Sequence, residues 1–160
     1  MFVCLHVYMT LFLDTTDYNA IHFALTDGKT LREQKHQLKY NENDKTLLLL
    51  DKFLKKHQAS FQLTSSALRA PSPLQEKVKT KAPLLKRRGA GVRFDRILVC
   101  TGPGSFTGTR VGVTIALALR LALDIKVGGI KKPQIPNDLR KLTKLKGSSE
   151  LKVSYNRPAL

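Results

Sequence analysis

Apolar residues are grouped along this chain in short runs that match strands and in two stretches with helical spacing. Residues 7–13 and 20–26 are rich in apolar, β-branched and aromatic side chains, which predicts two strands. Asp27-Gly28 favours a hairpin into a third strand at 29–37. That third strand is polar, which is typical of a sheet edge where charge discourages aggregation.

Leucines at helical spacing predict a first helix from residue 43 to residue 56. Asn43 or Asp44 can cap its N-terminus with a side-chain oxygen. Lysines occupy several of the remaining positions. The apolar positions of this helix are Leu47, Leu48, Leu50, Phe53 and Leu54.

The second half of the ordered pattern is a buried strand at 97–100, a glycine-bearing loop, a helix to Leu123 and a strand at 125–130. The predicted element order is therefore β-β-β-α-β-α-β. Antiparallel strands followed by helical crossovers predict an α/β fold, a mixed five-stranded sheet with helices on its faces. This is the ribonuclease-H-like arrangement that also builds actin, the Hsp70 ATPase domain and sugar kinases.

Two segments differ from the rest in composition. Residues 58–93 hold three prolines, a Ser/Thr cluster and eight Lys/Arg with one Glu, which predicts a basic, mobile insertion. Residues 131–160 are predicted to form a basic C-terminal tail, with a short helical stretch at 137–145 and an extended run at 151–155. We therefore expect one lobe over residues 1–130, followed by this tail.

The formal net charge of +16 is unevenly distributed. Residues 1–60 carry +1, residues 61–125 carry +8 and residues 126–160 carry +7. Such an excess either tracks phosphates or forms a solvated surface, and the sequence leaves both interpretations open. No aromatic residues alternate with these charges, so sequence-specific RNA recognition is disfavoured.

The apolar start of the chain predicts a strand rather than a leader or a membrane span. Residues 1–13 lack a basic first region and a following cleavage site, and they are too few to cross a bilayer as a helix. Met9 is an alternative start. Cys4 and Cys100 lie in apolar runs without metal-ligand spacing, which predicts buried free thiols in a reducing compartment.

The segment GPGSFTGTRVGVTIALALRLAL, Gly102–Leu123, carries most of the chemical information. Its glycines allow a sharp strand-to-helix turn, and Ser105 or Thr107 can cap the helix, whose first N–H groups attract anions. The GxGxxxG spacing fits neither a Walker loop nor GxGxxG, so a phosphate loop and a ligand-free turn both stay open. The candidate nucleotide or phosphate loop comprises Asp14, Thr15, Gly102, Gly104, Ser105, Phe106, Thr107 and Gly108.

The helix after this loop is apolar on nearly all sides. Between Val111 and Leu123 only Thr114 and Arg120 are strongly polar, so both sides of the helix need cover. The small residues Gly108, Gly112 and Ala116 form a stripe that seats the helix either on its own sheet or on a partner. The opposite, leucine-rich face predicts a partner protein. The expected interface residues are Leu47, Leu50, Leu54, Arg110, Val111, Thr114, Ala118 and Leu121.

Residues 96–130, with GPGSFTGTRVGV at their centre, resemble the signature of the TsaB (YeaZ) family. Leu11-Phe12-Leu13-Asp14-Thr15-Thr16 resembles the family's first strand and Asp-Thr-Ser turn, with Thr16 in place of Ser. Tyr155-Asn156-Arg157-Pro158 is a weaker match to the family's C-terminal end. The family has a second lobe of similar fold, and the thirty residues after Ile130 are too few for one, so we expect a short, one-lobe variant.

The resemblance implies a cytoplasmic, non-catalytic subunit of the machinery that makes N6-threonylcarbamoyladenosine in tRNA. TsaB proteins pair through helices with the catalytic subunit TsaD, and the ATPase TsaE joins them. The resemblance therefore implies contact with tRNA through the complex, no intrinsic cofactor, and ATP or ADP bound at the TsaD interface. A homodimer is expected when the chain is alone, since a copy of itself offers a similar surface.

Residue chemistry gives no catalytic centre and no metal site. The four histidines are His6, His22, His36 and His57, and none forms the His-x-x-x-His pair that holds a metal in TsaD-like enzymes. Asp14 follows the first strand, where ribonuclease-H-like nucleases place a metal-binding carboxylate, but few other acidic residues follow it. We expect Asp14 to cap the following turn. Competing hypotheses are an actin/Hsp70-like nucleotide-binding ATPase or kinase and a basic RNA-binding module.

Overall fold

Five strands form one mixed sheet in the computed structural model, which describes residues 8–39, 42–57 and 93–156. Except for Arg93, the predicted insertion 58–93 lies outside the described residues, as do Cys4 and His6. The strands are β1 (Tyr8–Asp14), β2 (Ala20–Thr26), β3 (Leu31–Gln37), β4 (Arg93–Cys100) and β5 (Lys126–Ile130). The helices are α1 (Thr46–Lys56) and α2 (Phe106–Leu123), with 3₁₀ helices η1 (Asn43–Lys45), η3 (Lys132–Gln134) and η4 (Leu139–Lys144).

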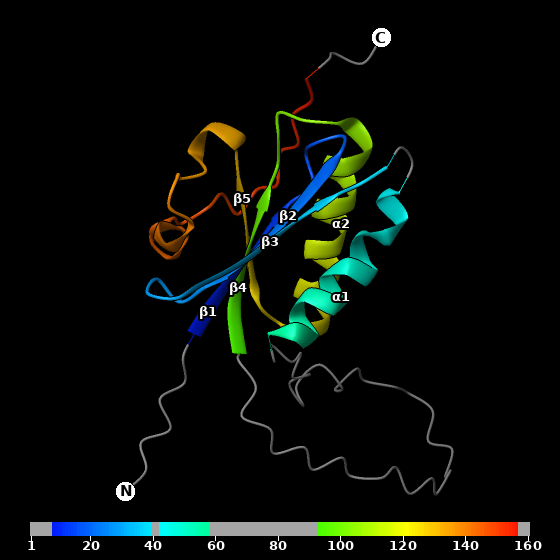
Figure 1. Ribbon diagram of the computed structural model, residues 1–160. Helices are drawn as coiled ribbons and strands as arrows, with labels where there is room; N and C mark the ends of the chain where they lie inside the picture. The colour runs from blue at the N-terminus through cyan, green and yellow to red at the C-terminus, as the bar shows by residue number, and fades with distance from the viewer. Residues whose placement is uncertain (1–7, 40–41, 58–92, 157–160) are drawn as a thin grey trace, which may run out of the picture.

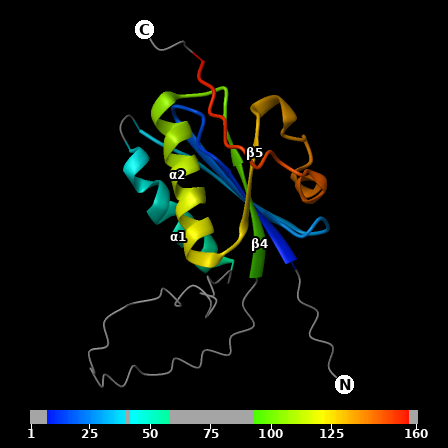
Figure 2. The same cartoon turned by 180° about the vertical axis from the view of Figure 1, so that it is seen from behind.

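The strand order is β3-β2-β1-β4-β5, which confirms the predicted ribonuclease-H-like sheet. β1 pairs antiparallel with β2 and parallel with β4, while β2–β3 is antiparallel and β4–β5 is parallel. Both α-helices lie on one side of the sheet, and η3 and η4 lie on the other (Figure 1). Seen from behind, the C-terminal segment runs past β5 toward the start of α2 (Figure 2).

The side of the sheet that faces α1 and α2 holds the larger hydrophobic core. Side chains of a strand alternate between faces, so Leu11 and Leu13 of β1 point into this core with Ile97 and Val99 of β4. Leu50, Phe53 and Leu54 of α1 fill it from the other side, at the i, i+3, i+4 spacing of one helix face.

The opposite side of the sheet holds a smaller core, covered by residues that the sequence predicted as a tail. Phe12 and Leu98 of the central strands pack there against Leu139 and Leu142 of η4. The predicted helical stretch 137–145 is therefore a 3₁₀ helix that belongs to the hydrophobic core. Strand segments with cover on both sides need continuous apolar sequence, as residues 11–13 of β1 and residues 97–100 of β4 have.

Arg96 of β4 fixes η4 to the sheet. Its guanidinium group donates hydrogen bonds to the carbonyl oxygens of Leu142, Thr143 and Leu145, at 3.1, 2.9 and 2.6 Å. It also reaches the hydroxyl oxygen of Thr10 at 3.3 Å. A half-buried cation thus binds three carbonyl groups at the end of η4, of which that of Leu142 also accepts from the Leu145 N–H at 3.1 Å.

The N-cap position of the first helix differs from the predicted one, and the side chain of Asn43 lies outside the described part of the structure. Residue Lys45 precedes α1 and makes no side-chain capping bond, and residues Asn43–Lys45 form the 3₁₀ turn η1. The Glu42 carboxylate instead accepts from the Lys39 backbone N–H at 3.1 Å and pairs with the Lys45 ammonium at 2.6 Å. The Glu42 side chain, at the start of the turn before α1, therefore stabilises this turn.

The two edges of the sheet differ in how they are protected. β3 is an edge strand with the sequence LREQKHQ, and its hairpin to β2 contains Gly28 at φ +92°, as Asp27-Gly28 predicted. At the other edge, Ser148 exchanges two backbone hydrogen bonds of 2.8 Å with Gly129 of β5. Charge thus protects one edge, and backbone pairing covers part of the other.

Candidate functional site

The glycine loop joins β4 to α2 and is closed by a helix cap. Ser105 has extended backbone angles, and its hydroxyl oxygen accepts from the Gly108 N–H at 3.1 Å, which confirms it as the cap. Thr109 donates to the Ser105 carbonyl oxygen through both its N–H and its hydroxyl group. Ser105 therefore holds the N–H groups of Gly108 and Thr109 in the first turn of α2.

The turn after β1 holds the loop from one side. Asp14 accepts from the N–H and the hydroxyl group of Thr16, at 3.0 and 2.7 Å, and so caps this turn as predicted. The Thr16 carbonyl oxygen accepts from the Ser105 N–H at 2.7 Å, and the Thr15 hydroxyl donates to the Gly108 carbonyl oxygen at 2.7 Å. Candidate loop residues from distant parts of the sequence thus meet in space.

The C-terminal segment holds the loop from the other side. Ser154 N–H donates to the Thr101 carbonyl oxygen at 2.8 Å, and Asn156 N–H donates to that of Gly104 at 3.2 Å. Gly102 has φ +107°, and a Cβ there would overlap the Ser154 carbonyl oxygen, so only glycine fits. The arrangement favours a structural joint, because protein atoms occupy both flanks of the loop.

Phe106 and Thr107 lie apart from the other candidate loop residues, exposed on the first turn of α2. The Arg110 guanidinium carbon lies 3.7 Å above the centre of the Phe106 ring, and its Nε donates to the Tyr155 hydroxyl at 3.0 Å. The Tyr155 ring lies 4.8 Å from that of Phe106. Sequence reasoning missed this cluster, and the only signal for it was the weak C-terminal match at Tyr155.

The small-residue stripe of α2 faces the sheet of its own chain. Of the two alternatives that the sequence left open, its own sheet or a partner, the stripe therefore packs on its own sheet. Gly108, Gly112 and Ala116 are all buried. A Cβ at Gly108 would overlap the Thr15 carbonyl oxygen, and one at Gly112 would overlap the Thr15 hydroxyl oxygen. Close approach of α2 to the β1 turn therefore requires these glycines.

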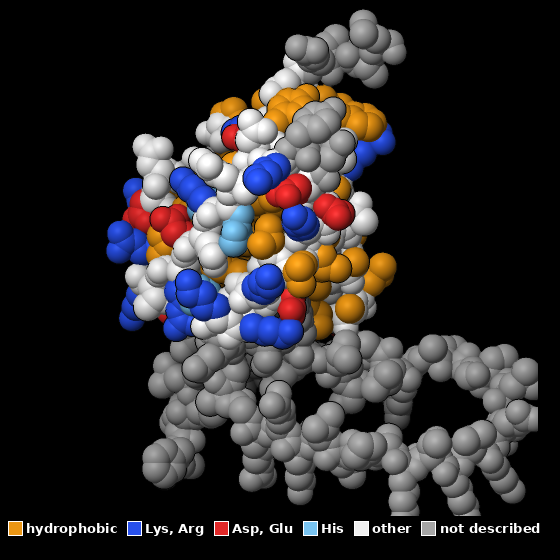
Figure 3. Space-filling model, turned by 45° about the vertical axis from the view of Figure 1, so that its right-hand side comes forward, with side chains coloured by type: hydrophobic (Ala, Val, Ile, Leu, Met, Phe, Trp, Pro, Cys, Tyr) orange, Lys and Arg blue, Asp and Glu red, His pale blue; other side chains and the backbone are white. Residues whose placement is uncertain are grey.

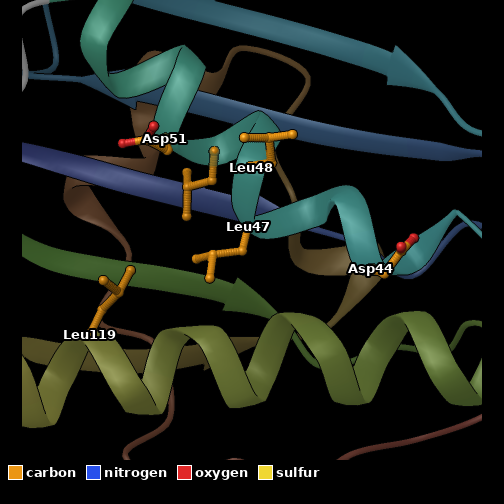
Figure 4. A pocket seen from close by; sticks show the side chains of 6 residues that line it. Asp44, Leu47, Leu48, Asp51 and Leu119 are labelled. Carbon is orange, nitrogen blue, oxygen red and sulfur yellow. The ribbon is translucent and has the colours of Figure 1, made fainter.

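The other side of the two helices carries exposed leucines. Leu121 is 81% exposed, Leu47 is 59% exposed and Leu48 is 54% exposed. Between the helices lies an open groove of about 520 Å³, into which Leu47 points from α1 and Leu119 points from α2 (Figure 4). The space-filling view shows hydrophobic side chains gathered over these helices, with charged groups around them (Figure 3). We call this surface the helix face.

The helix face includes only part of the predicted interface. Leu47, Arg110, Thr114, Ala118 and Leu121 are exposed, and Val111 is half-buried. The prediction that Leu50 and Leu54 belong to the interface is wrong. Both side chains are 1% exposed in the core against the sheet, so they offer no surface to a partner. Two exposed leucines were missed as interface candidates, Leu48 and Leu117, since helical spacing alone does not tell which side of a leucine-rich helix faces the sheet.

The length and apolar composition of α2 are those of a membrane-spanning helix, which among the described residues is true of this helix alone. Its small-residue stripe nevertheless lies against the sheet. Composition of this kind also occurs in a helix that packs on a core on one side and on another protein on the other side.

Titratable groups within the described residues are dispersed, and no three His, Cys, Asp or Glu side chains lie close enough together to hold a metal ion. Cys100 is a buried free thiol, and burial raises its pKa to about 11. Burial also lowers the pKa of His22, whose Nε2 lies 3.2 Å from the Glu33 carboxylate. Cys100 is buried in the core, and His22 packs edge-on against the Phe12 ring, as side chains with a structural role do.

Comparisons of the sequence with known proteins find similarity to TsaD and to TsaB. The TsaD sequence profile, described as tRNA N6-adenosine threonylcarbamoyltransferase, matches residues 74–134. The tRNA threonylcarbamoyladenosine biosynthesis protein TsaB of Bacillus subtilis is 46% identical over 37 residues, which are 23% of this chain and 16% of that protein.

Solved structures share the fold over most of this chain. YeaZ from Pseudomonas aeruginosa superposes with a TM-score of 0.53 at 18% identity, covering 78% of this chain and 44% of that one. A second structure, described as a protein with similarity to peptidase YeaZ from Pseudomonas aeruginosa, gives the same TM-score over 43% of its length. The chain spans less than half the length of either, and the resemblance to the TsaB (YeaZ) family is confirmed.

Proposed function

We propose that this chain, which has the TsaB (YeaZ) fold, is a cytoplasmic, non-catalytic subunit in the synthesis of tRNA threonylcarbamoyladenosine. It docks on a TsaD-related catalytic subunit and supports that enzyme. The names of the relatives support the pathway, since both the B. subtilis protein and the TsaD profile concern this modification. The absence of a metal-binding cluster within the described residues is compatible with the proposal but does not test it.

The helix face is the observation that carries the docking proposal. The exposed Leu47 and Leu48 of α1 and the half-buried Leu119 of α2 line an open apolar groove, and Leu117 and Leu121 of α2 are exposed outside it. An apolar patch of this kind on a folded protein usually marks a contact with another protein. Asp44 and Asp51 lie at the groove and supply a polar rim, as in protein interfaces. The TsaD-related subunit is therefore proposed to cover Leu47, Leu117 and Leu121.

Co-purification with TsaD from the same organism tests the docking, with Leu121→Glu as the disruptive variant. The charge would be buried without a partner, so we expect at least tenfold weaker binding, which corresponds to about 1.4 kcal/mol. Tyr18→Glu is the matched control, because Tyr18 is 65% exposed but lies in the turn between β1 and β2 and does not line the groove between the helices. Failure of the unmodified chain to bind TsaD at micromolar concentration, or equal weakening by both variants, would contradict the proposal.

A modification assay with purified tRNA tests the subunit role. TsaD is expected to transfer the threonylcarbamoyl group faster with this chain than without it, and the Leu121→Glu variant should lose the effect. Transfer by this chain in the absence of TsaD would show catalysis and overturn the non-catalytic part of the proposal.

Self-association, nucleotide binding and the recruitment of a TsaE-like ATPase belong to the same proposal. Sedimentation of the chain alone is expected to show a homodimer that the Leu121→Glu variant lacks, since the same face is exposed on each copy. Calorimetry with ATP or ADP is expected to show binding only after TsaD is added, because the glycine loop of the chain is filled from both sides. Equal nucleotide binding by the chain alone would favour an actin-like ATPase instead.

A further inference from the structure

The side of the sheet opposite the helix face carries a concentration of cations. One shallow hollow lies there, between η4 and the β2–β3 hairpin, and a second lies at the β5 edge of the sheet, where the end of α2 also lines it. The first is lined by Lys29, Arg140, Lys141 and Lys144, and the second by Arg96, Arg120, Lys126 and Lys146. We call this combined surface the basic face.

The two hollows belong to one surface because η4 connects them. The Arg96 guanidinium lines the second hollow and donates to carbonyl groups of η4, whose own side chains line the first. Gly28, at the hairpin tip, packs against Thr143 of η4, so the hairpin is fixed to the same element. The cations are thus held on a rigid support rather than on separate loops.

The positive charge of the basic face is largely uncompensated. Three carboxylates line the hollows, and two of them are already bound: Asp27 accepts from the N–H groups of Lys29 and Thr30, and Asp138 pairs with Arg140 at 3.0 Å. Within the described part of the chain, no lysine of the two hollows forms an ion pair. Clustered lysines without an ion-pair partner favour a polyanionic ligand.

We infer that the basic face binds the phosphate backbone of RNA, independently of base sequence. Phosphate contacts need only accessible cations, whereas binding to a membrane surface also needs exposed apolar side chains. None of the exposed large hydrophobic residues lines either hollow, so a lipid surface is disfavoured. Neither hollow contains an aromatic residue, so bases have nothing to stack on and sequence-specific recognition is not expected.

This inference assigns an RNA contact to the chain itself, and only the choice of tRNA as probe rests on the proposed function. The experiment uses fluorescence anisotropy with the full chain, labelled tRNA and an unrelated RNA hairpin over a range of salt concentrations. Binding to both RNAs is expected, and the affinity should fall steeply as salt rises. The assay contains no TsaD, so a failure of docking does not affect its outcome.

The variant K141Q/K144Q/K146Q removes three cations from the basic face. We expect at least tenfold weaker RNA binding at about 100 mM salt, and a salt-dependence slope smaller by about 2, from about 0.7 for each lost phosphate contact. The matched control K52Q/K55Q/K56Q removes the same charge from α1 and should change the affinity less than twofold. K141R/K144R/K146R should retain binding, which also controls for folding.

Three results would overturn the inference. Equal losses in the two Gln variants would show an unspecific effect of net charge. An unmodified chain that binds neither RNA at low salt would exclude the contact. Binding to vesicles with anionic lipid but not to RNA would assign the cations to a membrane surface instead.

Discussion

The two faces of the sheet are covered in different ways. On the helix face side, two α-helices cover the sheet and place Leu50, Phe53 and Leu54 in the core. On the other side, short 3₁₀ helices cover it with Leu139 and Leu142, and Arg96 holds them through backbone carbonyl groups. The α-helices expose leucine side chains to solvent, whereas the 3₁₀ helix η4 exposes lysine and arginine side chains.

This difference indicates two distinct kinds of surface on one small sheet. A long helix that is apolar on most sides fills a core with one side and leaves leucines exposed on the other, which favours a protein partner. A short segment held by one guanidinium group needs few apolar residues, so its remaining positions are free to carry charge. The proposed TsaD contact therefore lies on the helix side, and the inferred RNA contact lies on the opposite side and at the β5 edge, where Arg120 of α2 takes part.

The largest expected effect is the loss of core volume on either side of the sheet. Leu50→Ala and Leu142→Ala each remove a side chain that is 1% exposed or less, so each should lower the free energy of unfolding by about 2–5 kcal/mol. Urea denaturation measures both. Hydrogen exchange should show that Leu142→Ala loosens η4 and leaves α1 protected, and uniform loss of protection would contradict separate covers.

A smaller effect is expected from overpacking beneath α2. Gly112→Ala places a methyl group against the Thr15 hydroxyl, which should cost about 1–3 kcal/mol of stability. Thr15→Ala in the same chain should recover part of this loss, because it removes the overlapping atom. Gly108→Ala is the control, since it meets the Thr15 backbone carbonyl and no side-chain change can relieve it. Equal recovery of both glycine variants would be inconsistent with this packing.

The Arg96 clamp is expected to contribute less than the cores. Arg96→Lys keeps the charge but cannot reach three carbonyl groups at once, so we expect a loss of about 1–2 kcal/mol in thermal or urea unfolding. Arg120→Lys, an exposed arginine of the same hollow, should change stability by less than about 0.5 kcal/mol. A loss of similar size in both variants would show that charge type, rather than the clamp, matters.

The smallest expected effect is a pH dependence below neutrality. Burial lowers the pKa of His36, and Lys52 and Lys56 lower it further, while burial also lowers the pKa of His22 on the opposite side. The unfolded chain then takes up protons near pH 6.5 and the folded chain only at lower pH, so stability falls as pH falls below about 6.5.

His36→Gln should flatten this pH dependence in urea midpoints measured between about pH 5 and pH 8. His22→Gln should flatten it as well, with an added loss of the contact to Glu33. An unchanged slope in both variants would show that these two histidines are not the groups responsible.

Much of the fold could be predicted from the sequence because periodicity and turn chemistry are local. The apolar run in residues 20–26, the Asp27-Gly28 turn and the Ser105 cap each depend on neighbours in the chain. The packing of residues 131–156 on the sheet could not be predicted. It depends on hydrogen bonds from Arg96 to carbonyl groups some fifty residues away, and such bonds leave no pattern in the sequence. The same reason explains the errors at Leu50 and Leu54, whose direction depends on how α1 rests on the sheet.

The protection of the sheet edges has a consequence for assembly. β3 offers an edge strand with Arg32, Glu33 and Lys35, and β5 already pairs through Gly129 with Ser148. Pairing with a strand of another molecule is thus opposed by charged side chains at the β3 edge and by the existing Ser148 pairing at the β5 edge. Growth of the sheet from copy to copy, the route to fibrils and to strand-exchanged oligomers, is disfavoured at both ends, and side-chain packing on the two faces is the mode of association that the fold leaves open.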